Sequence, residues 1–287
     1  TISFVLMWSA PGSPFMGEKL PPPEVMANLE AKYGLDQPYR KQYVDYLTNV
    51  IFHFDFGPSF KFKDRTVNDI IAQGFPVTLT YGFWSFIVAV IFGVGLGVTA
   101  AIRHNTWLDY LSVGFAIGSQ SIPNYVMAPI LVLVFTLWLG WLPGGGWEGG
   151  TWDHIIMPVI ALSTSYFASI ARITRSSMLE VLNSGFIRTA KAKGLPMSRV
   201  ILKHALKPAL LPVLSYLGPA FVGMVTGSVI IDQYFSTGGI GQFFVNSAFN
   251  RDYSTMMGIT ILVGTLTIIF NLLVDVLYAW IDPKIRY

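Results

Sequence analysis

The sequence predicts an all-α membrane protein, because it is too apolar for a soluble domain and contains several long runs almost without charge. Of its 287 residues, 53% are hydrophobic and 12% are Asp, Glu, Lys or Arg, whereas soluble domains are about 25% charged. The mean hydropathy is +0.53. The chain has no Cys and no HExxH pair, which excludes disulfides, thiolate catalysis and Cys-ligated metals.

Five segments are long and apolar enough to be expected to span a bilayer. A spanning helix needs roughly 20 mostly apolar residues, because backbone polar groups in hydrocarbon must be satisfied within the segment. The expected spans are 75–102, 110–139, 155–171 with a polar continuation, 209–231 and 254–280. Residues 1–11 are apolar but short, so we interpret them as the outer end of a first spanning helix whose start is absent from this sequence. A short interfacial segment is the alternative.

Lys and Arg residues in short loops predict the orientation, because they are retained on the cytoplasmic side. One set of loops carries Arg103, Arg172, Arg175, Arg188, Lys191, Lys193, Arg199, Lys203, Lys207, Lys284 and Arg286. The opposite short loops contain only Arg251. The C-terminus is therefore expected in the cytoplasm, 12–74 is expected outside, and 75–287 is expected to be a five-helix core with a cytoplasmic loop at about 181–208. This topology separates His53 and His154 from His104 and His204, so no four-His metal site is expected.

The interior of the expected spans contains small and weakly polar residues in place of charges. Ala89, Gly93, Gly97 and Ala101 recur every four residues, which places them on one helix face for close packing, either within the chain or against another subunit. Pro123 and Pro219 remove backbone hydrogen bonds in mid-span. The polar residues at the first break, Ser119, Gln120, Ser121 and Asn124, are expected to lie at a neighbouring helix or a water-filled path.

The chain shows no means of driving transport by itself. Asp275 is the clearest acidic residue in a span, and it lies near the expected cytoplasmic end, where a structural or partner-contact role is favoured over proton coupling. No Gly-Lys dipeptide exists, so there is no Walker A loop to hold ATP phosphates. Energy for active transport would have to come from another protein.

The segment FIRTAKAKGLPMSRVILKHALKP, which starts at Phe186, is the most basic part of the chain. It is expected to form a short helix that ends at Gly194 and Pro196, with Ala190 and Gly194 leaving one side almost free of side chains. Further on, Arg199, Lys203 and Lys207 are spaced as a basic stripe on a second helix. Retention of these charges beside anionic lipid headgroups is the simpler explanation of the stripe.

This segment resembles the cytoplasmic EAA loop of permease subunits in binding-protein-dependent ABC importers. Arg188 and Thr189 replace the eponymous Glu and Ala, as in the peptide-importer branch. Similar stretches run along the whole chain, among them APGSPF, LPPPEVMANLEAKYGL, FDFGPSF, LPGGGW, SIARITRSSMLEVL, HALKPALLPVLSYLGPAFVG and VDVLYAWIDPKIRY. Together they resemble the B-type transmembrane subunits of oligopeptide importers. One departure is IDQYFSTGGIG, where Asp232 stands for Glu and Gly238 for Pro of the family's outer ETxxxxPGIG pattern, so a rigid proline turn is not expected.

The resemblance implies a type I importer permease of six transmembrane helices, the first truncated here, with no catalytic residue, metal or nucleic-acid partner. It implies a second homologous permease subunit, two ATPase subunits that bind ATP and Mg, and a peptide-binding protein that docks near residues 11–75. It implies a bacterial inner-membrane location in contact with lipid. The residues expected to contact the ATPases are Phe186, Arg188, Thr189, Ala190, Lys191, Lys193, Gly194, Leu195 and Pro196. Candidates for the path or its gate are Gln120, Ser121, Asn124 and Asp232.

Three other functions stay open at this point. A dipeptide, nickel or glutathione permease would share the same features. A proton-coupled peptide carrier would need buried ionisable groups in several helices, which the sequence does not contain. A membrane enzyme would need a nucleophile–base or metal constellation on one side of the bilayer, which the separated His residues and absent Cys disfavour.

Overall fold

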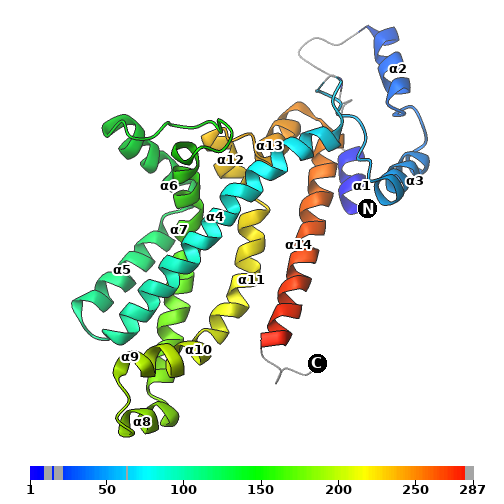
Figure 1. Cartoon of the computed structure of the whole chain (residues 1–287). Helices are drawn as coiled ribbons and strands as arrows, with labels where there is room; N and C mark the ends of the chain where they lie inside the picture. Colours follow the sequence, from blue (N-terminus) through cyan, green and yellow to red (C-terminus); the bar gives the residue numbers. More distant parts are fainter. Residues whose placement is uncertain (10–14, 16–21, 63, 282–287) are drawn as a thin grey trace.

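The computed structural model describes residues 1–9, 15, 22–62 and 64–281, and these residues form helices joined by loops (Figure 1). The outer segment and its surroundings contain α1 (Ile2–Trp8), α2 (Pro23–Lys32), α3 (Tyr39–Thr48) and the π-helical turn η1 (Asn49–His53). The core begins with α4 (Val67–Ile102) and ends with α14 (Tyr253–Ile281). Lys284 and Arg286 lie outside the described residues.

The first long helix, α4, begins at Val67 and not at Phe75 as predicted. Its N-terminus is a capping box, in which the Asp69 backbone N–H donates to Thr66 Oγ1 and the Thr66 N–H donates to the Asp69 carboxylate. These bonds satisfy N–H groups that a helix start leaves free. The hydropathy of the sequence locates the apolar part of α4 but not its capped polar start.

The expected single span 110–139 is wrong as a straight helix. It consists of α5 (Trp107–Ser121), then α6 (Asn124–Leu131) continued by the π-helix η2 (Val132–Trp138), and the two parts meet at 103°. Pro123 has no N–H, and Ile122 before it is extended with φ −93° and ψ 111°, as the residue before a proline prefers. Pro123 therefore separates two helices, whereas we had expected it only to weaken one continuous helix.

The later spans also differ from their predicted limits. α7 is one helix from Trp152 to Leu182. α9 (Met197–Arg199), η3 (Val200–Ala205) and α10 (Leu206–Ala209) meet α11 (Leu211–Val225) at 55°. Gly227, with φ +87°, follows the end of α11, so the predicted limit at Ile231 falls in a separate helix, α12 (Val229–Phe235).

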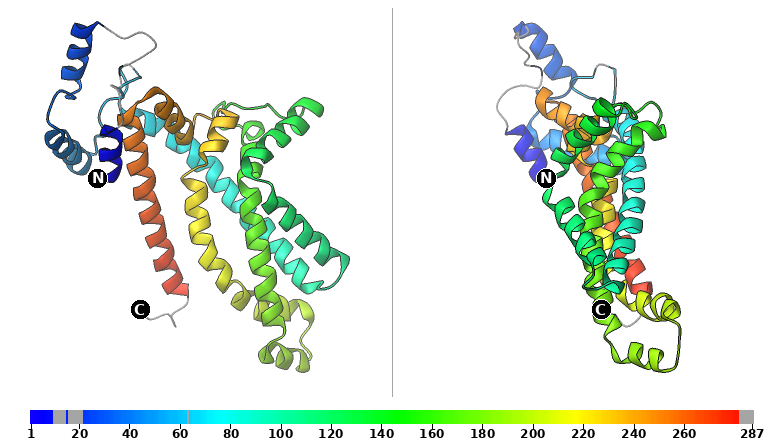
Figure 2. Two further views of the ribbon diagram at one scale, coloured as in Figure 1. Left: turned by 180° about the vertical axis from the view of Figure 1, so that it is seen from behind. Right: turned by 90° about the vertical axis from the view of Figure 1, so that its left-hand side faces the viewer.

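The described residues contain three helices long and apolar enough to cross a membrane, or up to five if each bent pair is one span. The upper number equals the five spans expected in 75–287. Both views in Figure 2 place α8 (Gly185–Ala192) at the end of the molecule opposite α2. α13 (Ile240–Asn250) lies with α12 near the N-terminal end of α14 (Figure 1).

The small-residue face of α4 packs against α7 of the same chain. A Cβ added at Gly97 would lie 2.5 Å from the Ala171 carbonyl oxygen and 2.5 Å from Thr174 Cβ. A Cβ at Gly93 would lie 2.7 Å from Ile170 Cβ. Ala89 and Ala101, on the same face, are buried. Of the two alternatives for this stripe, the structure therefore supports packing within one chain.

The outer segment is attached to the start of α14 by a buried carboxylate. Asp252 accepts hydrogen bonds from the Ser59 hydroxyl and, at 3.1 Å, from the Phe60 N–H. It also accepts from the Thr255 hydroxyl at 2.8 Å in the first turn of α14. Because a buried carboxylate without such donors is costly, this bond set holds residues 59–60 and α14 together.

We predict that Gly97→Ala destabilises the chain by about 1–3 kcal/mol, because the new methyl group meets backbone and Cβ atoms that cannot move independently. Gly95→Ala is the matched control, since a Cβ there has no neighbour within 4 Å. The control should be neutral or slightly stabilising. Thermal unfolding in detergent measures both, and equal midpoints for the two variants would refute the close α4–α7 contact.

Candidate functional site

The basic loop folds as the predicted short helix with a sharp end. α8 runs from Gly185 to Ala192, and Gly194 has φ +77°. The Gly194 N–H donates to the Lys191 carbonyl at 2.9 Å, and the Leu195 N–H donates to the Ala190 carbonyl at 3.4 Å. This pair of bonds is a Schellman motif, which requires a left-handed residue that glycine supplies without strain. The predicted helix and its end at Gly194 are confirmed.

The two faces of α8 have different surroundings. Ile187 and Ala190 are 0% and 8% exposed, and they join a small apolar core with Met178 of α7 and Val200 of η3. The prediction that the small side at Ala190 lies open for a partner is therefore wrong, because this chain itself covers Ala190. Gly194 does remain open, since an added Cβ would meet no atom within 4 Å.

The exposed face of α8 carries most of the residues predicted to contact ATPases. It consists of Phe186, Arg188, Thr189, Lys191 and Lys193, and the exposed surface continues through Gly194 and Pro196, with Leu195 half-buried. In the next helical segment the predicted basic residues Arg199, Lys203 and Lys207 are exposed as well. The site is thus a small helix fixed to the core on one side and presenting a basic surface on the other.

Asp232 lies at a different place from the other path candidates. Its side chain is 0% exposed. Its carboxylate accepts hydrogen bonds from the Thr237 hydroxyl, from the Gly241 N–H at 3.0 Å and from Thr78 Oγ1 at 3.3 Å. Burial raises the pKa of this carboxyl, and the Thr237 hydrogen bond opposes that shift. In this structure Asp232 ties α12, α13 and α4 together and does not line an open path.

The loop between α12 and α13 differs from a proline turn. Gly238 has φ +77°, a value that the proline ring, fixed near −65°, does not allow. Its N–H also donates to Gln242 Oε1 at 2.8 Å, and proline has no such donor. With Gly238 in place of the family's Pro, this loop therefore has a backbone conformation that proline could not adopt.

The residues at the break between α5 and α6 lie near α7. Gln120 and Ser121 are exposed, and Asn124 is half-buried. Ser165 Oγ of α7 donates to Asn124 Oδ1 at 2.8 Å. Three of the four predicted path residues are thus neighbours in sequence at one helix break, whereas Asp232 is enclosed elsewhere.

A polar stripe on α7 is a feature that the sequence reasoning missed. Ser165, Ser169, Arg172 and Ser176 follow the spacing i, i+4, i+7 and i+11, so they lie on one face of the helix. The first two are half-buried and the last two are exposed. The spacing itself was the available signal, since it is the helical period in a segment otherwise rich in apolar residues.

Asp109 is a second residue that the sequence reasoning missed. It is 1% exposed at the start of α5. Arg175 of α7 donates to both of its oxygens, from Nε at 2.7 Å and from a terminal nitrogen at 2.9 Å, and the Asn105 N–H and His104 Nδ1 lie 3.0 Å from Oδ2. A bidentate pair of this kind fixes α5 against α7 and neutralises one basic residue of the loop region.

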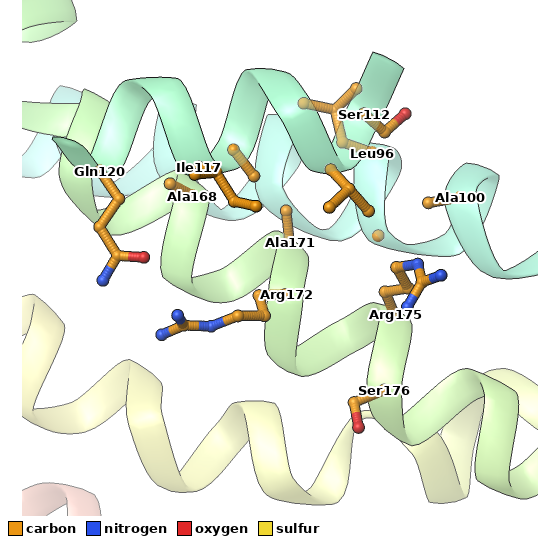
Figure 3. A pocket seen from close by; sticks show the side chains of 13 residues that line it. Leu96, Ala100, Ser112, Ile117, Gln120, Ala168, Ala171, Arg172, Arg175 and Ser176 are labelled. Atoms are coloured by element: carbon orange, nitrogen blue, oxygen red, sulfur yellow. The ribbon is translucent and has the colours of Figure 1, made fainter. Parts of the chain in front are cut away.

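The stripe borders a pocket of about 320 Å³ between α4, α5 and α7 (Figure 3), a volume within the usual range for small-molecule sites. Its lining is Leu96, Gly97, Ala100, Ser112, Val113, Ala116, Ile117, Gln120, Ala168, Ala171, Arg172, Arg175 and Ser176. Figure 3 shows Arg172 and Arg175 projecting from α7 in different directions. Among the described residues, no group of three or more His, Asp or Glu is placed to hold a metal ion.

The chain belongs to the family of binding-protein-dependent transport system inner membrane components, whose pattern matches residues 93–287. It is 61% identical to the oligopeptide transport system permease protein OppB of Salmonella typhimurium, over 100% of this chain and 94% of the relative. The OppB protein of Haemophilus influenzae is 59% identical with the same coverage. The dipeptide transport system permease protein DppB of Bacillus subtilis is 44% identical, over 100% of this chain and 92% of the relative.

Two solved structures with the same fold are of ABC transporters. An inward-facing structure of the MetNI methionine ABC transporter matches with a TM-score of 0.64 at 18% identity, over 75% of this chain and 97% of that one. An amino acid ABC transporter crystallised with histidines matches with a TM-score of 0.59 at 16% identity, over 74% of this chain and 94% of that one. The predicted fold, an all-α type I importer permease, is confirmed.

We predict that Asp232→Ala lowers stability by about 1–3 kcal/mol, because the buried Gly241 N–H and two hydroxyl groups lose their acceptor. Asp232→Asn keeps one acceptor oxygen and a similar volume, so it should cost less. Unfolding midpoints of the two variants in detergent check the order. An Asp232→Ala protein as stable as the wild type would contradict the structural role of this carboxylate.

Proposed function

We propose that this chain is the path-forming, non-catalytic permease subunit of an ATP-driven oligopeptide importer. The observation that carries the proposal is the 61% identity over the whole chain to proteins named as oligopeptide permeases. A dipeptide permease is the second candidate, favoured by the 44% identity to DppB. The separated His residues and the missing phosphate loop support a subunit that performs no chemistry itself.

The proposed complex contains a second homologous permease, two ATPase subunits and a peptide-binding protein. ATP and Mg would be bound by the ATPases, because this sequence has no Walker A loop. The proposed location is a bacterial inner membrane, with α8 and the C-terminus in the cytoplasm. The distribution of Lys and Arg supports this orientation, and α2 and α3 at the opposite end would then face the binding protein.

Coupling would run through α8 and the small core beneath it. Ile187 and Ala190 of α8 share this core with Ala101 of α4, Met178 of α7 and Val200 of η3. Close packing transmits displacement because the interior has few voids to absorb it. A partner that moves the exposed face of α8 would therefore move the inner ends of three other elements together, which is what alternating access requires.

The test of this function is uptake by the complete transporter in proteoliposomes. We expect peptide uptake to require ATP and to survive collapse of the proton gradient by an uncoupler when ATP is held constant. The reason is that the sequence contains no phosphate loop of its own and no set of interior carboxylates for proton coupling. Uptake that an uncoupler abolishes at clamped ATP would overturn the proposal in favour of a proton-coupled carrier.

We predict that Gly194→Val inserts at normal levels but loses transport, and that ATP hydrolysis no longer responds to the loaded binding protein. Valine is strongly disfavoured at φ +77° and adds bulk at an exposed contact, while no membrane span is altered. Lys203→Glu, on the basic stripe, should have a milder effect.

Gly194→Asn is the matched control for the backbone, because Asn tolerates the left-handed region. Partial activity of Gly194→Asn would assign the defect to φ, and loss of activity would assign it to bulk at the contact. Normal transport by Gly194→Val at wild-type abundance would remove the coupling role from this segment.

A further inference from the structure

The exposed residues in the second half of α7 are all polar, whereas the exposed residues of α14 are largely apolar. In the most apolar part of α14 only 17% of residues are buried, and its exposed side chains include Ile268, Leu272 and Val276, as expected for contact with lipid. In α7 the corresponding share is 72%. The residues that α7 exposes in its second half are Arg172, Ser176 and Glu180, and the half-buried Ser165 and Ser169 lie on the same face as Arg172. This polar face indicates contact with water.

Arg172 is the one cation of this stripe, and its charge is not neutralised within the described part of the chain. Arg175, one turn further, is bound by Asp109. Arg172 is exposed and has no carboxylate within 4.0 Å among the described residues. Helical rise places it roughly 30 Å from Trp152, near one boundary of the hydrocarbon layer. A cation kept there without an acid partner is costly unless an anion or water meets it.

The pocket next to Arg172 is suited to an apolar group attached to an anion. Its walls are mostly small or aliphatic, from Leu96 and Ala100 of α4 to Val113 and Ile117 of α5. Gln120 adds an amide, and Figure 3 shows Arg172 extending from α7 on the side of Gln120. The described lining includes no Asp or Glu, so the pocket offers a counter-charge to an anion and none to an ammonium group.

The neighbouring helix α11 has a proline on an exposed face, which leaves one backbone carbonyl without its helical partner. Pro219 has no N–H, so the Ser215 carbonyl loses its partner in the helix. Both residues are exposed, and α11 is in contact with α7. Free carbonyls at membrane depth are tolerated where they meet water, which supports contact of this face of α11 with water.

We propose that Arg172 binds the C-terminal carboxylate of the transported peptide in the inner half of the path, while the pocket between α4, α5 and α7 receives its last side chain. The inference rests on the proposed function and assigns a substrate contact within it. A guanidinium and a carboxylate form paired, charge-assisted hydrogen bonds. Anionic lipid is the competing occupant, but the polar stripe of α7, which begins at Ser165 beside Asn124, favours the path.

The experiment uses the complete transporter with its binding protein in proteoliposomes. ATP-driven uptake of one tripeptide is compared in two forms, with a free C-terminal carboxylate and with a C-terminal amide. The binding protein is the same for all permease variants. Its own preference for acid or amide therefore cancels when the acid-to-amide uptake ratio is compared between variants. Arg172→Gln is the test, Arg172→Lys is the conservative variant, and Arg103→Gln removes an exposed cation that does not line the pocket.

We expect Arg172→Gln to lower uptake of the free acid roughly tenfold and to leave uptake of the amide within about twofold of wild type. Arg172→Lys should restore part of the ratio, and Arg103→Gln should keep it. Stimulation of ATP hydrolysis by the loaded binding protein should be normal in all three.

An unchanged acid-to-amide ratio in Arg172→Gln would overturn the inference. An equal decrease in uptake of both peptides, together with loss of copurifying phosphatidylglycerol, would overturn the inference in favour of a lipid site. Failure of the proposed function would look different, because wild-type complex would then import neither peptide with ATP.

Discussion

The close contact between α4 and α7 is the constraint on which the rest of the structure depends. Gly93 and Gly97 have no room for a Cβ against α7, so the two helix backbones lie nearly as close as they can. α7 is also the helix against which α5, α6 and α11 pack. The Asp109–Arg175 pair and the apolar core under α8 are both built on its second half. In a bilayer, where apolar burial drives helices together only weakly, such small-residue contacts hold a core together.

This arrangement gives α7 both proposed roles, contact with the substrate and coupling to α8. The polar stripe of α7 lies on one side, and Met178, two residues beyond Ser176, lies in the core that fixes α8. A displacement of α8 therefore acts on the helix that carries the proposed path residues, without an intermediate loop. The hydrogen bonds of Asp232 and Asp252 hold the opposite end of the core.

Much of this structure is predictable from the sequence, and the failures have physical causes. Hydropathy located the segments that fold into three long apolar helices and two bent helix pairs, and Gly194 with Pro196 located the end of α8. Hydropathy carries no information about a capping box, so it did not predict that α4 starts at Val67. It also carries no information about the 103° bend at Pro123. Ala190 was assigned to a partner because a small side chain suits any close contact, including one within the chain. Asp232 was expected near the path from its place in the family's outer pattern, and its donor Thr78, 154 residues away in the sequence, could not be recognised there.

The most direct test of the account is photocrosslinking from the exposed face of α8 in the complete transporter. A photoreactive residue at Lys191 would lie on the exposed surface, whereas one at Asn183, before α8 begins, serves as the control on the same loop. The account predicts a crosslink from position 191 to the ATP-hydrolysing subunit, with a yield that changes when nucleotide binds. Crosslinks from position 191 to lipid alone, with full transport activity, would contradict it.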